Sequence, residues 1–325
     1  MKEVETKMLE RAKELLESGE VARVVGWKKG EFCYDPSPAT FESVEELKDF
    51  TYDWFCGANL SKYLIQISKK EGKTAVFLKP CDTYSFNQLV KEHRIKRENI
   101  HVIAVECRGK FDIEKIKAKG ISFVTGAQLD GTQVKVSTLY GEETLEKSDV
   151  VLTKCATCNK DYQVQDEAII LHERTKKDVD RFAEVAKLEA MTEEERFAFW
   201  REQLSKCIRC NACRNVCPAC SCVKCVFDNP ASEISAKVNS DKFEEQLFHI
   251  IRAFHVAGRC TDCGECSRVC PQHIPLHLLN RKFIKDIDNF YGEYQAGETA
   301  EGKTPLTSYT EGDTEPNDVF KGEAK

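Results

Sequence analysis

Apolar residues in the first half of the chain occur in two patterns, at helical spacing and in short continuous runs. Met8, Ala12 and Leu15 recur at helical spacing, which predicts an amphipathic helix near the N-terminus. Continuous apolar runs at 74–78 and 100–106 have the form of strands that are buried on both faces. Helical patterns alternate with such runs, and this alternation predicts an α/β domain with a parallel sheet. The other elements expected here are strands at 21–27, 121–124, 134–139 and 150–152 and helices from 43, at 59–70, from 82 and at 112–118.

The second half of the chain is patterned for helices. Residues 176–206 are highly charged with apolar side chains on one side, and residues 240–257 carry an apolar stripe from Phe243 to Phe254. A last helix is expected at about 275–290. We therefore expect a mainly α-helical second domain.

The chain beyond Gly292 has a different composition. Residues 292–325 contain few apolar side chains, with eight acidic and three basic ones. Such a segment cannot bury enough apolar surface to form its own core, so we expect a flexible, extended acidic tail. The predicted boundaries are an α/β domain at 1–175, a helical domain at 176–291 and the tail at 292–325.

Composition and charge narrow the class of protein. Hydrophobic residues make up 41% and charged residues 31% of the 325 residues, and no run of about 18–20 apolar residues suggests a membrane span. The N-terminus lacks the apolar core of a signal peptide, so a cytoplasmic location is expected. A net charge of −6 argues against a dedicated nucleic-acid binder.

Cysteine is the unusual residue, with 17 copies, of which eleven lie between Cys207 and Cys270. An odd number of cysteines in a long chain without a secretory signal argues against a disulfide framework. In a reducing compartment such cysteines are most simply interpreted as metal ligands.

Eight of the cysteines form two copies of one motif, C-x2-C-x2-C-x3-C-P. In this arrangement three closely spaced thiolates hold three corners of a [4Fe-4S] cubane, and the fourth cysteine ligates the other cluster. One predicted cluster is held by Cys207, Cys210, Cys213 and Cys270. The other is held by Cys260, Cys263, Cys266 and Cys217. Zinc does not account for eight cysteines in this duplicated register.

The spacing between the two motifs indicates the type of ferredoxin. Forty-two residues separate Cys217 from Cys260, and they include a predicted long helix. A compact bacterial ferredoxin has no room for that insertion. The second domain therefore resembles the α-helical ferredoxin type found in electron-transfer subunits, a resemblance that does not identify the reaction.

Four further cysteines follow strand ends of the first domain. Cys81 follows the strand at 74–78, Cys107 follows the strand at 100–106, and Cys155 and Cys158 follow a third apolar run. Because open α/β sheets place their sites at the carboxyl ends of strands, these thiols could converge on a third [4Fe-4S] cluster. The alternative is that they are buried structural cysteines.

The same segments resemble the beta subunit family of deazaflavin (coenzyme F420) hydrogenases and dehydrogenases. The matching segments are Lys79-Pro80-Cys81-Asp82, Ala104-Val105-Glu106-Cys107 and Cys155-Ala156-Thr157-Cys158-Asn159-Lys160-Asp161. The resemblance covers about residues 55–165 and implies that these four cysteines hold a [4Fe-4S] cluster beside an FAD. The family continues with a Gly- and Ser-rich stretch, whereas this chain has no glycine between Cys158 and Gly258. Glycine turns are the simplest cradle for a pyrophosphate, so FAD is not the favoured cofactor.

Five cysteines lie outside these sets. Cys220, Cys222 and Cys225 follow the first motif, and Cys56 could supply a fourth ligand, which would make a fourth [4Fe-4S] cluster and leave Cys33 over. The alternatives are thiols that pack around the dicluster or that bind metal only under some conditions.

Charged residues and histidines give weaker signals. The seven histidines form no metal-binding pattern. Four arginines near the motifs could offset cluster charge, form a docking face for an acidic ferredoxin, or lie on a solvated surface: Arg209, Arg214, Arg259 and Arg268.

Together these patterns predict an iron–sulfur electron-transfer subunit of an anaerobic, multi-subunit oxidoreductase. The resemblance suggests a catalytic hydrogenase or formate dehydrogenase subunit at one end of the relay. At the other end we expect a flavin-bearing subunit, which could be electron-bifurcating, or ferredoxin. The rival interpretation is a self-contained FAD-dependent deazaflavin or ferredoxin oxidoreductase. A heterodisulfide-type reductase subunit is a weaker third interpretation, because its cysteine-rich motifs are missing.

The predicted tail has two interpretations. It could be a strap that docks on a partner subunit through its few apolar residues, Leu306, Tyr309, Val319 and Phe320. Alternatively it is a solubilising acidic segment.

Overall fold

The computed structural model describes residues 1–170, 172, 176–229 and 242–307. Its N-terminal part is built on a five-stranded sheet with strand order β2-β1-β3-β4-β8. The strands are β1 (Arg23–Lys28), β2 (Ser37–Phe41), β3 (Thr74–Leu78), β4 (Ile100–Val105) and β8 (Glu167–Ile169). The helix α1 (Lys2–Glu17) packs on this sheet through its predicted apolar face, which includes Met8, Ala12 and Leu15.

The main sheet is mixed, whereas the sequence predicted a parallel one. Strands β1, β3, β4 and β8 are parallel, and β2 pairs with β1 in the antiparallel direction. The sequence SPATF of β2 is only half-buried at four of its five positions, so it lacks the apolar run that marked β3 and β4. The carboxyl ends of the parallel strands lie at one edge of the sheet, and this is the edge where the sequence predicted a site.

Short helices and turns connect these strands. They are η1 (Glu45–Asp49), η2 (Ser61–Tyr63), α2 (Leu64–Ile67), α3 (Pro80–Lys91), η3 (Arg97–Asn99) and α4 (Ile113–Ala118). The helix expected at 59–70 is therefore shorter than predicted. The helix α3 begins two residues before the expected Asp82, because Pro80 is suited to the first helical position. Cys81 consequently lies in the first turn of α3.

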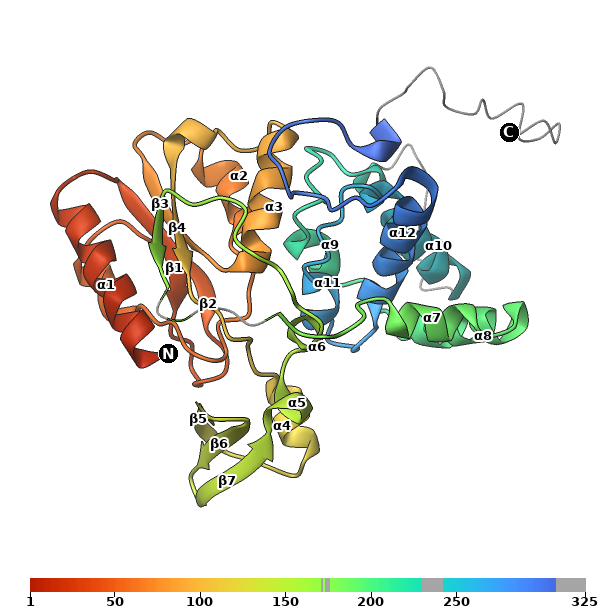
Figure 1. Cartoon of the computed structure of the whole chain (residues 1–325), viewed down its shortest axis with the longest axis horizontal. Coiled ribbons are helices and arrows are strands. Elements are labelled where there is room, and N and C mark those ends of the chain that lie inside the picture. The colour runs from red at the N-terminus through yellow and green to blue at the C-terminus, as the bar shows by residue number, and fades with distance from the viewer. Residues whose placement is uncertain (171, 173–175, 230–241, 308–325) are drawn as a thin grey trace.

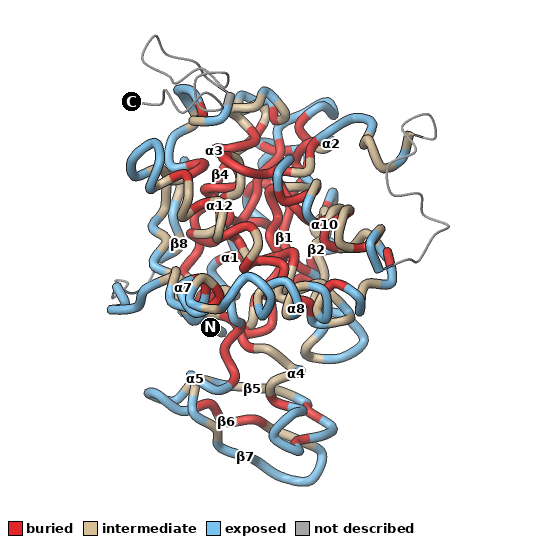
Figure 2. The backbone as a smooth tube through the Cα atoms, turned by 90° about the vertical axis from the view of Figure 1, so that its right-hand side faces the viewer, coloured by how far each residue is buried: buried red, intermediate tan, exposed pale blue. Residues whose placement is uncertain are grey.

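A second, three-stranded sheet projects from the main body, as Figures 1 and 2 show. It is an antiparallel meander of β5 (Val124–Asp130), β6 (Gln133–Thr138) and β7 (Gly141–Glu146). Val134 and Val136 pack on one side with Ile116 and Phe111. Of the strand expected at 121–124, only Val124 is in a strand, as the first residue of β5, and β5 extends further along the chain than predicted. The expected strand at 150–152 instead joins α5 (Lys147–Val150) to α6 (Thr153–Ala156).

The C-terminal part is helical, as the sequence predicted. It contains α7 (Ala183–Glu189), α8 (Glu193–Leu204), α9 (Ala212–Val216), η4 (Val226–Asp228), α10 (Lys242–Val256), α11 (Glu265–Arg268) and α12 (Leu276–Tyr291). Figure 1 shows this helical part on the side of the main sheet where α3 lies, opposite α1. No helix of the described residues is long and apolar enough to cross a membrane.

The first part of the predicted tail packs on the body. Ala296 and Thr304 are buried, and a Cβ at Gly297 would lie 1.9 Å from the carbonyl oxygen of Tyr84 in α3. The segment ends in η6 (Pro305–Thr307), where Leu306 contacts Gly258. The other three predicted anchors, Tyr309, Val319 and Phe320, lie outside the described residues.

Candidate iron–sulfur sites

The two cysteine motifs have the same backbone conformation. Arg209 and Asn211 in the first motif have positive φ angles, and so do Asp262 and Gly264 at the corresponding positions of the second. A short helix follows each turn, α9 in the first motif and α11 in the second. The duplicated spacing in the sequence is therefore matched by a duplicated local structure.

The first group of cysteines surrounds one cavity in the helical part. This cavity is lined by the three leading cysteines of the first motif and the last cysteine of the second, Cys207, Cys210, Cys213 and Cys270. Cys207, Cys213 and Cys270 also pack in one apolar cluster with Leu204 and Ile274, and this cluster includes Cys266 of the second motif. The four cysteines that line the cavity are those that the sequence assigned to one cubane, and four thiolates around one space are a donor set that suits an iron–sulfur cluster.

The second group gathers around Cys217. Cys217 packs with Cys260 and Cys220 against Val256. Burial first, and then the neighbouring Cys217 thiol, raise the pKa of Cys260, and burial with Glu265 and Cys217 raises that of Cys263. A cluster is ligated by thiolates, so its binding to Cys260 and Cys263 would require the loss of their protons.

Helix α10 presents a buried cation to both groups. The Arg252 side chain is 3% exposed, and its Nη2 donates to the carbonyl oxygen of Cys213 at 3.4 Å. Burial alone would lower the pKa of Arg252, but the nearby cysteine thiols, Cys266 first and Cys217 next, raise it. Arg252 is placed to offset negative charge on both sulfur groups.

The four arginines singled out by sequence are instead engaged with carboxylates. Arg209 pairs with Glu245 and Arg214 with Asp228. The other two pairs are Arg259 with Glu92 and Arg268 with Glu265. Each of the four thus pairs with a carboxylate of this chain, and a docking face for an acidic ferredoxin stays a prediction.

The third group of cysteines shares one large cavity at the carboxyl edge of the sheet. Cys81, Cys107, Cys155 and Cys158 all line a cavity of about 850 Å³, and Cys263 of the second motif lines it too. Burial and the neighbouring Cys107 raise the pKa of Cys155 to about 11. Burial and Asp82 likewise raise the pKa of Cys81 well above its usual value.

Basic side chains dominate the wall of this cavity. They are Lys79, Arg108, Lys110, Lys147, Lys154, Lys160, Lys176, Lys177, Arg181 and Arg281. The acidic ones are Glu106, Asp161, Asp262, Asp288, Glu293 and Glu298. Burial lowers the pKa of Lys160 to about 8. A cavity with this charge balance favours anionic occupants, which include thiolate-ligated clusters and phosphate-bearing cofactors.

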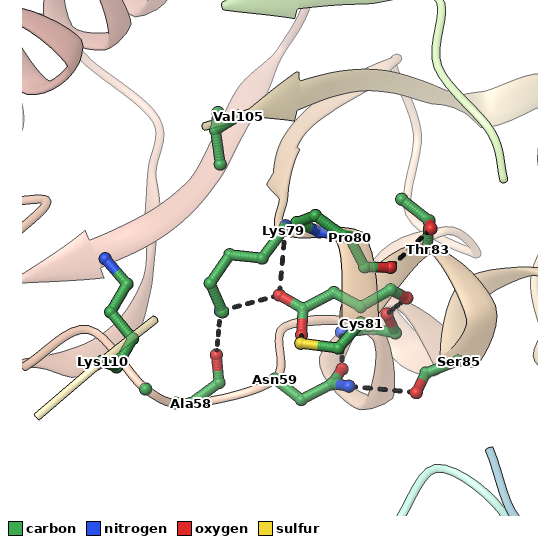
Figure 3. Close-up of polar contacts among 12 residues, drawn as sticks. Ala58, Asn59, Lys79, Pro80, Cys81, Thr83, Ser85, Val105 and Lys110 are labelled. Atoms are coloured by element: carbon green, nitrogen blue, oxygen red, sulfur yellow. Dashed lines mark hydrogen bonds and ion pairs between the residues drawn. The ribbon is translucent and has the colours of Figure 1, made fainter. Parts of the chain in front are cut away.

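Two lysines of this wall are fully buried. The Nζ of Lys79 donates to the carbonyl oxygen of Ala58 at 2.7 Å and to Asp82 at 2.8 Å, as Figure 3 shows beside Cys81. The Nζ of Lys110 donates to the carbonyl oxygen of Asp53 at 2.6 Å and lies 3.7 Å from the centre of the Tyr52 ring. Burial lowers the pKa of Lys110, while Cys107 and Cys56 raise it.

A buried ion-pair network joins the two parts of the chain. Glu265, between Cys263 and Cys266, is fully buried and pairs with Lys154, the residue before Cys155. Glu265 also accepts hydrogen bonds from Arg268 at 2.8 Å and from the backbone amide of Asn59 at 3.1 Å. Burial alone would raise the pKa of Glu265, but Arg268 and Lys154 hold it well below its usual range.

The proposed fourth set is spread over two parts of the chain. Cys56 lies in the core of the N-terminal part, where its thiol contacts Thr51 and Asp53. Cys220 packs beside Cys217, Cys222 is exposed and Cys225 is half-buried. Cys33 is half-buried, with its Sγ 3.5 Å from the carbonyl oxygen of Val124. The described contacts of Cys56 do not include the other three cysteines, and their grouping stays a prediction.

The sequence analysis missed the polar residues that face the sulfur groups. The sequence shows an apolar stripe from Phe243 to Phe254 on this helix, but Phe243, Ile250 and Phe254 are exposed. The buried face of α10 carries Glu245, Phe248, His249, Arg252, Ala253 and Val256. A signal was present in the sequence, because His249 and Arg252 stand three residues apart and so share one helix face.

The duplicated motif has a counterpart among known protein families. Residues 203–274 match the family model described as a 4Fe-4S dicluster domain. The helical part of the chain therefore carries a 4Fe-4S dicluster domain.

Two curated relatives match most of the chain. The F420-dependent formate dehydrogenase subunit beta of Methanocaldococcus jannaschii is 24% identical over 84% of this chain and 87% of the relative. The F420-dependent formate dehydrogenase 1 subunit beta of Methanococcus maripaludis is 26% identical over 85% and 87%, respectively. Over most of its length the chain is thus a homologue of F420-dependent formate dehydrogenase beta subunits, and the predicted resemblance is confirmed.

One solved structure aligns with part of the chain. A chain of the F420-reducing [NiFe] hydrogenase complex from Methanosarcina barkeri aligns with 47% of this chain and 62% of that chain, at 13% identity and a TM-score of 0.37. This TM-score is too low to indicate a shared fold or function.

Proposed function

We propose that this protein relays electrons within a multi-subunit oxidoreductase, between a hydrogenase- or formate dehydrogenase-type catalytic subunit and a flavin-bearing subunit or ferredoxin. Its homologues with a 4Fe-4S domain support the broader statement, an iron–sulfur electron-transfer subunit of an oxidoreductase. The relatives are named as subunits, which supports the expectation of partner chains. The identities of the electron donor and the electron acceptor are part of this proposal.

Three sets of cysteines would hold the clusters. The sets are Cys207, Cys210, Cys213 and Cys270; Cys260, Cys263, Cys266 and Cys217; and Cys81, Cys107, Cys155 and Cys158. A bound [4Fe-4S] cluster supplies one-electron chemistry at a potential set by its ligands, hydrogen bonds and burial. The chain itself contributes the thiolates, the buried Arg252 and the Glu265–Lys154 pair that connects two of the sets.

One observation carries this proposal. Cys263 of the dicluster motif lines the same cavity as the four cysteines of the N-terminal part. The ligand sets of two proposed clusters are therefore neighbours across the boundary between the two parts. A self-contained ferredoxin module would have no need of such a junction.

Cysteine substitution tests the third cluster. The full chain would be purified anaerobically as wild type, C81S and C33S, and its iron and acid-labile sulfide measured. C81S is expected to lose about four iron atoms per chain, because one cubane holds four. C33S, which changes a cysteine outside the three sets, is expected to keep the wild-type content. Equal iron content in C81S and wild type would contradict the assignment.

A second candidate function is a self-contained flavoprotein. The cavity of about 850 Å³ and its many lysines and arginines would suit an anionic flavin, and the relatives are named as F420-dependent. Flavin content of the purified chain, with an assay of F420 reduction by the isolated chain, separates the two candidates. Stoichiometric FAD with F420 reduction would favour the flavoprotein, and flavin-free protein would favour the relay.

A further inference from the structure

A buried histidine faces the first group of cysteines. His249 on α10 is 1% exposed and lines the same cavity as Cys207, Cys210, Cys213 and Cys270. One of its ring nitrogens lies within 4.8 Å of the Cys207 Sγ. Neither ring nitrogen has a hydrogen-bond partner among the described residues, although both are buried.

The groups around this imidazole restrict what it can bind. Glu245 has a carboxylate oxygen within 4.8 Å of a ring nitrogen, but it is hydrogen-bonded to neither nitrogen and accepts instead from the Arg209 Nε at 2.7 Å. Arg252, one helical turn further along α10, is a donor and offers no lone pair. On its other side the ring contacts Phe248 edge to face. A buried N–H without an acceptor is unfavourable, so the cysteine-lined cavity is the remaining place for one.

We propose that His249 donates a ring N–H hydrogen bond to a sulfur of the [4Fe-4S] cluster held by Cys207, Cys210, Cys213 and Cys270, and thereby raises that cluster's reduction potential. This inference rests on the cluster assignment made under the proposed function. A donated hydrogen bond stabilises the more negative, reduced cluster, which is why it raises the potential.

The second group has a comparable donor. The Nδ2 of Asn280, which is 4% exposed, donates to the Cys266 Sγ at 3.6 Å. In addition to Arg252, which faces both groups, each cysteine group of the dicluster domain thus has a buried side-chain nitrogen of its own, His249 on α10 for the first and Asn280 on α12 for the second. Because the donors differ, they offer a way for one chain to give its two clusters different potentials.

Redox titration of the full, anaerobically purified chain tests the proposal, with EPR spectra recorded at each potential. H249F removes both ring nitrogens and keeps an aromatic ring, so the potential of one dicluster cluster is expected to become more negative. H249Q keeps a donor and is expected to stay near wild type. The control is H255F, since His255 is on the same helix but exposed. Unchanged potentials in H249F at full iron content would overturn the proposal.

A second readout does not depend on the variants folding. Protein grown with ¹⁵N-labelled histidine, otherwise unlabelled, should show a weak histidine-nitrogen coupling to one reduced cluster in pulsed EPR. Absence of that coupling, or a strong coupling typical of a direct iron–nitrogen bond, would overturn the hydrogen bond. If wild-type protein holds no pair of clusters at all, the proposed function fails, which iron analysis distinguishes from failure of this inference alone.

Discussion

At the scale of single residues, spacing in the sequence carried more information than residue type. The C-x2-C-x2-C-x3-C-P spacing predicted that Cys270 binds the same cluster as Cys207 and not the cluster of its sequence neighbours. In the structure Cys270 and Cys207 line one cavity. The signal for His249 and Arg252 was weaker, because a spacing of three residues places them on one helix face without indicating what that face contacts. Their role depends on where α10 packs, which the sequence does not state.

The cross-ligation of the dicluster makes a prediction at this scale. C213A and C270A are expected to remove the same EPR signal, because the two cysteines line one cavity. C266A is expected to remove the other signal, since Cys266 belongs to the second motif. If C270A and C266A remove the same signal instead, each motif holds its own cluster and the assignment is wrong.

The buried Glu265 makes a prediction about stability. E265Q removes the fully buried negative charge that pairs with both Lys154 and Arg268. Breaking a buried ion pair by removing one partner typically costs about 3–5 kcal/mol. Thermal unfolding of the anaerobic holoprotein should therefore occur at a clearly lower temperature. D149N, which breaks the exposed Lys119–Asp149 pair, is the control and should leave the transition in place. Equal transitions in both variants would contradict the role given to Glu265.

At the scale of elements, the sequence predicted the strands that are buried on both faces, whereas of the half-exposed strands it predicted only β6 along most of its length. Strands β3 and β4 are continuous apolar runs, and they form as expected with a shared carboxyl edge. Strand β2 and the small sheet β5-β6-β7 are half-exposed, so their composition overlaps with that of loops. The apolar stripe of α10 likewise did not indicate its buried residues, because the buried face is partly polar where it meets the cysteines.

The segment after Gly292 makes a prediction at this scale. G297V would place a side chain against the backbone of Tyr84, so residues 292–307 should detach from α3. G302V is the matched control, because Gly302 also has a positive φ but a Cβ there would meet no described atom within 4 Å. Limited proteolysis should cleave this segment faster in G297V than in G302V. Equal cleavage rates would show that the contact with Tyr84 does not hold the segment.

The predicted strap can be tested with its partner. Deleting residues 292–325 is expected to reduce co-purification with partner subunits if the segment docks on them. Because residues 292–307 already pack on this chain, a second deletion of residues 308–325 alone separates the two effects. Unchanged yield of the complex in both deletions would leave the segment a role within this chain only.

At the scale of the whole molecule, the two parts are joined where their proposed metal ligands meet. The cavity shared by Cys263 and the N-terminal cysteines lies beside the Glu265–Lys154 pair, so the junction and the ligand sets occupy one place. The order of domains followed from composition and motif spacing. The junction did not, since it depends on contacts between residues more than 100 positions apart.

Iron and acid-labile sulfide per chain, measured on anaerobically purified wild-type protein, test directly whether the chain holds three [4Fe-4S] clusters. We expect about twelve iron atoms and about twelve sulfides per chain, because each of the three cubanes contains four of both. About eight or fewer of each, with the third cysteine set intact, would contradict the claim that the relay extends from the dicluster domain into the N-terminal part.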